Sequence, residues 1–355
     1  MKLFKNIKNW LENQEHLFYL FLFILIVPNM VLCFTEPLPF MAKVANVLLP
    51  FGCYYLLMTL SRNCGKMLWI LFLFLFFGAF QIVLLYLFGQ SIIAVDMFLN
   101  LVTTNSSEAL ELLDNLTPAI IAVIILYVPA LILGMISIIR KRKLTVEFIR
   151  RERKRAFLVF GISLLSLVGA YVQDSGYELK SDLYPLNVCY NVGLAFQRTA
   201  LTQDYHRTSK DFTFHARPTH PEGKREVYVM VIGETSRALN WQLYGYERET
   251  NQLLSRQTGL IAFPKVLTES NTTHKSVPML MSDATACNYD SIYHQKGIIT
   301  AFKEAGFRTA FFSNQRYNHS FIDFFGMEAD TYDFIKEDSV SSTYNPSDDE
   351  LLKLV

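Results

Sequence analysis

The chain has 355 residues, of which 51% are hydrophobic and 14% aromatic, and its formal net charge is +1. This length allows two domains. Because the net charge is small and the basic residues are locally concentrated, no basic face is available for nucleic acid, and we expect no nucleic-acid partner. Nearly all long apolar runs lie before Asp174, and the remainder has the composition of a soluble globular protein.

Five segments in the first half are apolar and long enough to cross a bilayer, which takes about 20 residues. They lie near Leu17–Thr35, Lys43–Leu60, Met67–Phe88, Pro118–Ile139 and Ala156–Val172. The second is the weakest, with Pro50 near its middle. The first is too long, and too closely followed by others, to be only a cleaved signal peptide. The sequence therefore predicts a transmembrane domain over residues 1–173.

The loops give the orientation of these helices. Lysines and arginines gather at the N-terminus and between residues 140 and 155, whereas residues 90–117 contain none. The positive-inside rule then places the N-terminus in the cytoplasm and everything after Val172 on the other side of the membrane. The polar and apolar mixture of the 90–117 loop predicts an amphipathic helix along the outer interface.

Residues 174–224 are polar and are interrupted by Tyr, Asn, Pro and Gly, which predicts a linker. One helix is expected within it, over Leu186–Thr199, near the membrane surface. His206, His215 and His220 also lie here, and their spacing favours solvated side chains over a metal site.

From Arg225 onward the pattern alternates between strand and helix, which is typical of an α/β domain with a largely parallel sheet. We expect strands over 227–232, 260–267 and 309–312. We expect helices over 237–244, 252–256, 277–281 and 291–305, the last ending at Gly306.

Three residues stand where ligand sites form in such domains. Glu234 follows the first expected strand, and open α/β sheets bind ligands beyond the carboxyl ends of their strands. Thr272 and Thr273 precede a helix expected to start near Ser276-Val277-Pro278, where positive potential favours an alkoxide or a phosphate. Taken singly, both threonines could be helix caps, and Glu234 could be a first-turn acid that offsets a helix dipole.

The five cysteines show no metal-ligand spacing. Only Cys189 and Cys287 fall in the soluble part. They could form a disulfide, which sequence alone does not establish. Free, buried thiols are the favoured interpretation.

Three segments carry a family resemblance. They are the run from Gly233-Glu-Thr-Ser-Arg to Thr250-Asn251, the run Ser270-Asn-Thr-Thr-His-Lys-Ser-Val-Pro278, and Phe311-Phe-Ser-Asn-Gln315. Together they closely resemble the phosphoethanolamine transferases of Gram-negative bacteria, which include lipid A-modifying enzymes that confer polymyxin resistance. The resemblance implies a five-helix transmembrane domain, an interfacial linker, and a periplasmic domain of the alkaline phosphatase and sulfatase type over residues 225–355.

The resemblance also implies roles for single residues. Glu234 is similar to a zinc ligand of the family, and Thr273 to the nucleophile that also binds zinc. Asn314 and His319 lie where the family contacts the phosphoethanolamine group.

This chain departs from the family pattern in two ways. Glu269 and Met279 replace cysteines that form disulfides in many members. The Ser-Asp-His-Gly motif that completes the family's zinc site is absent, so we expect the chain to be the N-terminal part of a longer enzyme, inactive by itself.

The resemblance implies a reaction between two lipids at the bacterial inner membrane. Thr273 would attack phosphatidylethanolamine, and the phosphoethanolamine group would pass to lipid A or another envelope glycan; we expect the protein to act as a monomer. Two alternatives stay open, namely a glycerol-phosphate transferase of the lipoteichoic acid synthase type and an inactive membrane protein. A sulfatase is disfavoured, because no Cys-x-Pro-x-Arg motif is present.

Overall fold

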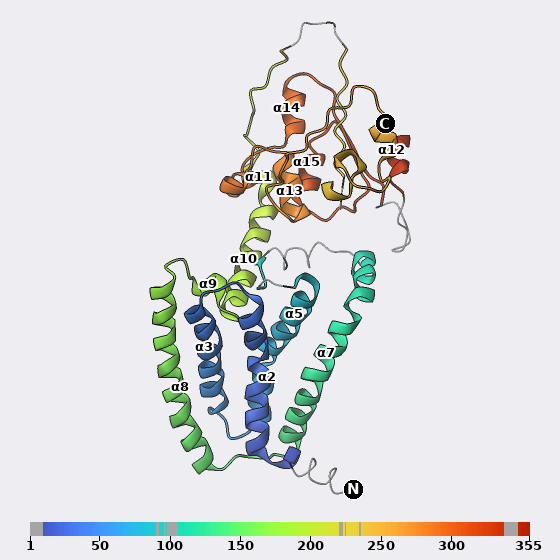
Figure 1. The fold of residues 1–355 in the computed structure, drawn as a ribbon. Helices are drawn as coiled ribbons and strands as arrows, with labels where there is room; N and C mark the ends of the chain where they lie inside the picture. Colours follow the sequence, from blue (N-terminus) through green and yellow to red (C-terminus); the bar gives the residue numbers. More distant parts are fainter. Residues whose placement is uncertain are drawn as a thin grey trace. The chain divides into compact units, whose positions relative to one another are not determined.

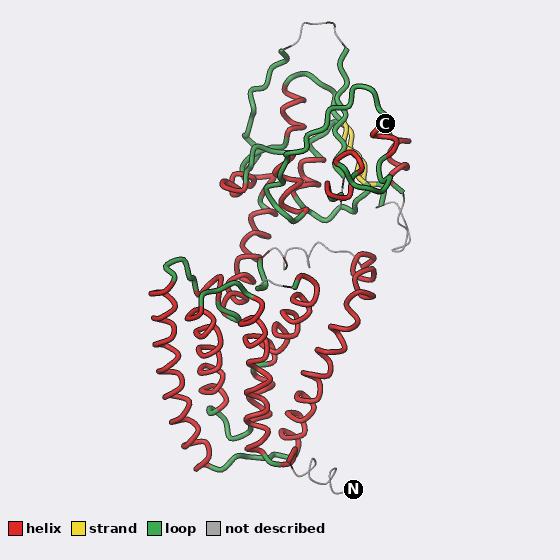
Figure 2. Tube along the Cα trace, in the orientation of Figure 1, coloured by secondary structure: helices red, strands yellow, loops and turns green. Residues whose placement is uncertain are grey.

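The computed structural model of the chain describes residues 10–89, 92–95, 97, 106–219, 223, 225–233, 236–336 and 347–355. The chain divides into two compact units, Met1–Phe196 and Gln197–Val355. The described part of the first unit is built of helices, and the second combines short helices with two short strands (Figures 1 and 2).

All five segments predicted to cross a membrane are helical. The helices are α2 (Gln14–Thr35), α3 (Phe40–Met58), α4 (Cys64–Ile70), α5 (Phe72–Phe88), α7 (Ser106–Ile139) and α8 (Val146–Gln173). Four of them, α2, α3, α7 and α8, are long and apolar enough to span a bilayer. Helices α4 and α5 form a bent pair, and if this pair crosses the membrane as a single span, the number is five. The prediction of an apolar helical domain is confirmed, with four to five such helices in the described residues.

The third predicted span is bent. The axes of α4 and α5 differ by 62°, and Leu71 between them has ψ 11°, far from the α-helical value of about −42°. No proline or glycine lies at the break, so no local sequence pattern predicts it.

Close backbone contact joins α4 to α7. A Cβ atom added to Gly65 would lie 2.2 Å from the carbonyl oxygen of Gly134. The absence of a side chain at Gly65 allows the two helices to approach this closely, as small residues do in many pairs of membrane helices.

A buried carboxylate connects two helices of this unit, α3 and α8. Glu152 of α8 is fully buried. It accepts hydrogen bonds from the hydroxyl of Tyr55 on α3, from Nε of Arg151 at 2.8 Å and from Nη1 of Arg155 at 2.9 Å. These donors offset the cost of removing the charge from water.

The segment after α8 is anchored to this bundle. The amide of Asn29 donates to the carbonyl oxygen of Tyr184 at 2.7 Å, and that of Asn46 donates to the carbonyl oxygen of Asp182 at 2.6 Å. Short α9 (Leu179–Asp182) precedes α10 (Leu186–Gln203), which corresponds to the helix expected from Leu186.

The second unit contains short elements. They are α11 (Tyr205–Thr208), η1 (Ala238–Asn240), η2 (Gln242–Tyr244), α12 (Gln252–Ser255), α13 (Thr273–Leu280), η3 (Ala286–Tyr293), α14 (Ile298–Glu304), β1 (Ala310–Ser313), α15 (Phe321–Gly326), β2 (Thr331–Phe334) and η4 (Asp348–Lys353). Strands β1 and β2 pair in parallel, with Ala310 opposite Thr331. The core beside them is formed by Tyr205, Met279, Ile292, Phe321, Phe324 and Phe325.

Two predicted strands do not form. Residues 227–232 and 260–267 are extended but belong to no ladder in the described part of the chain. Their side chains are exposed, with Val231 86% and Leu267 93% accessible. An apolar β-branched run becomes a buried strand only when neighbouring strands pair with its edges and helices cover its faces, and the described residues of this unit supply only the β1–β2 pair.

Three predicted helices differ in extent. The helix expected over 237–244 is two short 3₁₀ turns, η1 and η2, and the one expected over 291–305 is interrupted between Tyr293 and Ile298. The helix expected from about Val277 begins four residues earlier, at Thr273. The end at Gly306 is confirmed, with φ 85°. Of the loop over 90–117, where an amphipathic helix is expected, residues 90, 91, 96 and 98–105 lie outside the described residues, and residues 106–117 form the start of α7.

Two carboxylates attach residues 205–216 to this unit. Glu328 accepts hydrogen bonds from the hydroxyl of Tyr205 at 2.8 Å and from the backbone N–H of Gly297 at 2.9 Å. Glu304 of α14 accepts hydrogen bonds from the backbone N–H groups of Phe214 and Ala216, both at 3.0 Å.

These contacts predict an acid-dependent loss of stability. The N–H groups of Ala216 and Phe214 hold the pKa of Glu304 below its usual value, so the folded state binds this proton less tightly than the unfolded state. The stabilising contribution is therefore present above the unfolded pKa, about 4.3, and is lost as the pH falls through the folded pKa. We expect Glu304→Gln to unfold at a lower temperature at pH 7 and to lose less stability on acidification.

The measurement is the thermal midpoint of the detergent-solubilised chain at a series of pH values. Glu247→Gln is the matched control, because Glu247 is exposed and accepts no hydrogen bond from a described residue. Identical pH profiles for the wild type and Glu304→Gln would contradict the prediction.

Candidate active site

Thr273 is the first residue of α13. The preceding residue, Thr272, is the N-cap, with extended backbone angles (φ −124°, ψ 133°) and no capping hydrogen bond from its side chain. Its carbonyl oxygen accepts hydrogen bonds from the backbone N–H groups of Lys275 at 3.1 Å and Ser276 at 2.9 Å. The helix start is thus fixed by the backbone, and Thr273 lies at the N-terminal end of the helix, where the helix dipole creates positive potential.

The loop before Thr273 has its own hydroxyl contacts. Oγ of Ser270 lies 3.1 Å from Oγ1 of Thr272, and the same Ser270 oxygen accepts a hydrogen bond from the backbone N–H of Thr272 at 3.3 Å. The side chain of Thr272 is therefore turned toward the loop and does not cap the helix.

The other end of α13 is held in the core. Pro278 and Met279 are buried, and Met279 belongs to the aromatic cluster around Phe321 and Phe325. The backbone N–H of Ile298 donates to the carbonyl oxygen of Met281 at 2.6 Å. A helix anchored at its C-terminal end presents its N-terminal residue from a fixed position.

Glu269 and Met279, at which the family resemblance leads us to expect cysteines, make non-covalent contacts here. The carboxylate of Glu269 accepts a hydrogen bond from the backbone N–H of Ala286 at the start of η3, and Met279 packs in the core. Cys189 and Cys287 are both free, as favoured from sequence, but both are exposed and not buried.

Asn314 immediately follows β1. Its Nδ2 atom donates to Oδ1 of Asp348 at 2.6 Å. Asp348 opens η4, 34 residues further along the chain, so an acidic side chain from the C-terminal segment orients the Asn314 amide. Sequence reasoning did not single out Asp348.

His319 lies in a tight turn with a left-handed backbone, φ 60°, which is uncommon for residues other than glycine. Its ring packs edge-on against that of Tyr317, with 4.5 Å between centroids. The turn is held by Asp323, whose Oδ2 accepts hydrogen bonds from the backbone N–H groups of Asn318 at 2.7 Å and Ser320 at 3.2 Å.

Asp323 is therefore a structural carboxylate that supports the turn containing His319, a predicted substrate-binding residue. It is 2% exposed, and burial raises its pKa although these backbone N–H groups act in the opposite direction. Asp323 is also the third residue of α15 and closes a capping box with Ser320, which is the only sequence signal that could have revealed it.

The segments that carry Thr273 and His319 meet through packing. Helix α15, which begins two residues after His319, packs against α13 in the shared aromatic cluster. Gly326 at the end of α15 meets the ring of Phe311 on β1, where an added Cβ atom would lie 2.4 Å from a ring carbon. Helix α15 thus packs against both α13 and β1, the elements that carry Thr273 and precede Asn314.

Glu234 lies outside the described residues. Among the residues that the structure describes, no group of three or more His, Cys, Asp or Glu side chains is arranged to hold a metal ion. The described residues alone therefore do not fit a complete zinc centre.

Comparison with known proteins identifies relatives of the second unit. Residues 226–355 match the family described as Sulfatase. Phosphoethanolamine transferase EptA of Escherichia coli K12 is 34% identical over 87 residues, which are 24% of this chain and 16% of that protein.

Phosphatidylethanolamine transferases Mcr-2 and Mcr-1 of Escherichia coli are each 29% identical, over 128 and 137 residues. The matches cover 34% and 36% of this chain and 23% and 24% of those proteins. The chain thus spans about a quarter or less of the length of these relatives, and no solved structure matches it.

Proposed function

We propose that the protein transfers phosphoethanolamine from phosphatidylethanolamine to lipid A or another envelope glycan. The match of residues 226–355 to the sulfatase family, and their similarity to proteins named phosphoethanolamine transferases, support this proposal. The observation that carries the proposal is the position of Thr273 as the first residue of α13. Helix N-termini bind phosphate and stabilise negative charge on a nearby oxygen.

In the proposed first step, Oγ1 of Thr273 attacks the phosphorus of phosphatidylethanolamine. The new Oγ1–phosphorus bond forms as the bond from phosphorus to the diacylglycerol oxygen breaks, and the threonine proton ends on the released diacylglycerol. In the second step a phosphate or hydroxyl oxygen of the acceptor attacks the phosphothreonine, loses its own proton, and restores the threonine hydroxyl. Two such displacements give ping-pong kinetics.

We propose Glu234 and Thr273 as two ligands of a zinc ion, with its other ligands outside the residues described here. When bound, zinc supplies Lewis-acid stabilisation of phosphoryl oxygens and lowers the pKa of a coordinated hydroxyl. The chain's own contribution to this step is positional, since α13 is anchored at Met279 and Met281 and presents Thr273 from its free end.

Asn314 and His319 are proposed to contact the phosphoethanolamine group. The Asn314 amide is oriented by Asp348 at 2.6 Å, and the His319 turn is fixed by Asp323. Both side chains are therefore held before a substrate arrives, which reduces the ordering cost of binding.

Both proposed substrates are lipids, which gives the apolar helices a role. We propose the order of domains as 1–173 in the inner membrane, 174–224 as an interfacial linker and 225–355 in the periplasm, in a monomeric protein. A membrane-bound active site meets donor and acceptor in two dimensions and needs no soluble carrier.

The test is donor use by the complete gene product in vesicles. We expect release of diacylglycerol from vesicles of phosphatidylethanolamine but not from vesicles of phosphatidylglycerol, with one early equivalent per enzyme when no acceptor is added. Release from phosphatidylglycerol only would favour the glycerol-phosphate transferase. Release from neither lipid would favour an inactive protein.

A further inference from the structure

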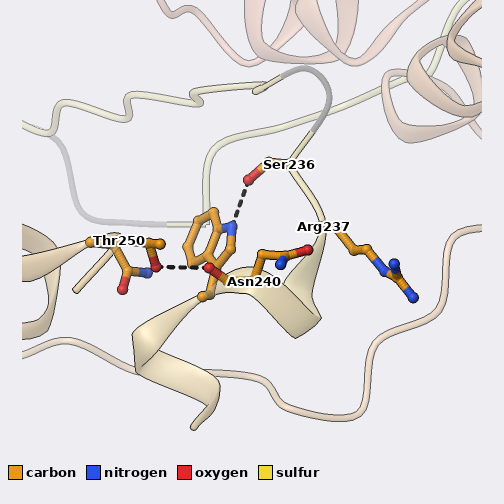
Figure 3. Close-up of a pocket in the computed structure, with 6 residues that line it drawn as sticks. Ser236, Arg237, Asn240 and Thr250 are labelled. Carbon is orange, nitrogen blue, oxygen red and sulfur yellow. Dashed lines mark hydrogen bonds between the residues drawn. The ribbon is translucent and has the colours of Figure 1, made fainter. Parts of the chain in front are cut away.

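A small polar pocket lies directly after the segment that contains Glu234. It is lined by Ser236, Arg237, Asn240, Trp241, Thr250 and Asn251 and has a volume of about 260 Å³ (Figure 3). Pockets for drug-sized ligands usually span about 300–1,000 Å³, so this one suits a smaller polar group. None of the roles assigned above to Thr273, Asn314 or His319 uses it.

Hydrogen bonds within the pocket wall hold its shape. Nε1 of Trp241 donates to Oγ of Ser236 at 2.6 Å, and Oγ1 of Thr250 donates to the carbonyl oxygen of Asn240 at 2.7 Å (Figure 3). One face of the Trp241 ring stacks on Tyr244, with 6.0 Å between centroids. The indole is thus fixed in place at the pocket.

The pocket wall also contains one donor without a partner among the described residues. Oδ1 of Asn251 accepts a hydrogen bond from the backbone N–H of Leu243 at 3.2 Å, whereas its Nδ2 atom is buried and has no hydrogen-bond partner among the described residues. A buried donor of this kind costs free energy unless a ligand or water satisfies it.

Arg237 supplies the charge. It lies on the rim, exposed, with its guanidinium directed away from Trp241 (Figure 3). Exposed side chains change rotamer within nanoseconds, so the guanidinium can turn over the pocket. Arginine presents a planar fork of donors that matches phosphate.

We propose that this pocket binds a phosphorylated sugar of the acceptor, with Arg237 and Nδ2 of Asn251 on the phosphate and the Trp241 ring beside the sugar. An aromatic ring with amide and hydroxyl groups around it suits a sugar, which has both apolar C–H faces and hydroxyls. The role of acceptor site rests on the proposed transferase function, but the binding itself does not.

Trp241 provides the reporter for the test. The chain has three tryptophans, so replacing Trp10 and Trp69 by phenylalanine leaves Trp241 as the single fluorophore in the detergent-solubilised chain. We expect glucosamine 1-phosphate to change its emission saturably in the millimolar range, and glucosamine without phosphate to leave it unchanged.

Two substitutions separate binding from folding. Arg237→Gln should weaken binding by on the order of 10- to 100-fold, as expected for a lost charge-assisted hydrogen bond. Asn251→Asp keeps the acceptor for Leu243 but replaces the donor by a negative charge, and should abolish binding. Arg256→Gln, the same change at an exposed arginine that does not line the pocket, should have no effect.

Each other outcome overturns part or all of the proposal. If inorganic phosphate binds as tightly as glucosamine 1-phosphate, the site does not recognise the sugar. If O-phosphoethanolamine binds most tightly, the pocket serves the donor. No saturable change with any phosphate compound, or equal affinity in Arg237→Gln, overturns the site itself. Because the readout is fluorescence, binding without any diacylglycerol release would refute the proposed function and leave the pocket standing.

Discussion

Replacing Thr273 by alanine is expected to abolish transfer, with a loss on the order of a thousandfold or more, as seen when a covalent nucleophile is removed. The fold should survive, because the start of α13 is fixed by the carbonyl oxygen of Thr272 and its end by Met279 in the core. The measurement is diacylglycerol release by the complete gene product in phosphatidylethanolamine vesicles, with thermal unfolding of the same samples as a check of folding.

Two further variants identify the hydroxyl that reacts. Thr273→Ser keeps a hydroxyl on the same carbon and should retain part of the activity. Thr272→Ala removes the neighbouring hydroxyl, which contacts Ser270 at 3.1 Å and lies outside the proposed chemistry, and should retain most of it. The opposite result, activity in Thr273→Ala and none in Thr272→Ala, would move the nucleophile to Thr272.

Replacing Gly65 by alanine should strongly destabilise the N-terminal unit. The added Cβ atom would lie 2.2 Å from the carbonyl oxygen of Gly134 and 2.9 Å from its Cα atom. Backbone atoms cannot move aside as a flexible side chain can, so α4 and α7 must separate. We expect a cost of about 3 kcal/mol or more and a fall in the unfolding temperature of roughly 5–10 °C.

Two other glycines provide matched controls in the same unit. An added Cβ atom at Gly134 would meet side-chain atoms of Leu68 at 3.2 Å and Trp69 at 3.5 Å, which can adjust, so Gly134→Ala should cost less. At Gly161 of α8 nothing lies within 4 Å, and alanine should leave stability unchanged or raise it by up to about 1 kcal/mol through helix propensity. Equal unfolding temperatures for Gly65→Ala and Gly161→Ala in detergent would show that α4 and α7 do not pack this closely.

Hydropathy located all five apolar helices, because a bilayer-length apolar run has few alternatives. It could not reveal the bend at Leu71, which depends on packing. In the second unit the apolar runs at 227–232 and 260–267 were assigned to strands on residue type alone, while the structure leaves them exposed. The four-residue strand β2, Thr331–Phe334, was missed, because so short a segment with an aspartate gives almost no periodic signal.

The sequence predicts the surroundings of the candidate site residues with different success from one residue to the next. The sequence predicts Thr273 just before a helix that starts near Ser276-Val277-Pro278, whereas the helix begins at Thr273 itself and Pro278 lies inside α13. The partners of Asn314 and His319 were not foreseen. Asp348 reaches Asn314 from 34 residues away, and no local pattern encodes such a contact, whereas the role of Asp323 follows from a capping box that can be read in the sequence.

The attachment of residues 205–216 to Glu304 and Glu328 has a practical consequence for recombining this protein with its relatives. In a chimera joined near residue 225, Tyr205 and the segment after it would come from a relative, whereas Glu304 and Glu328 would come from this chain. The hydrogen bonds between them would be lost unless the relative's segment had the same donors in the same positions. A crossover before Gln197 keeps each carboxylate with its own donors. Modules of this chain are therefore best exchanged at that upstream junction.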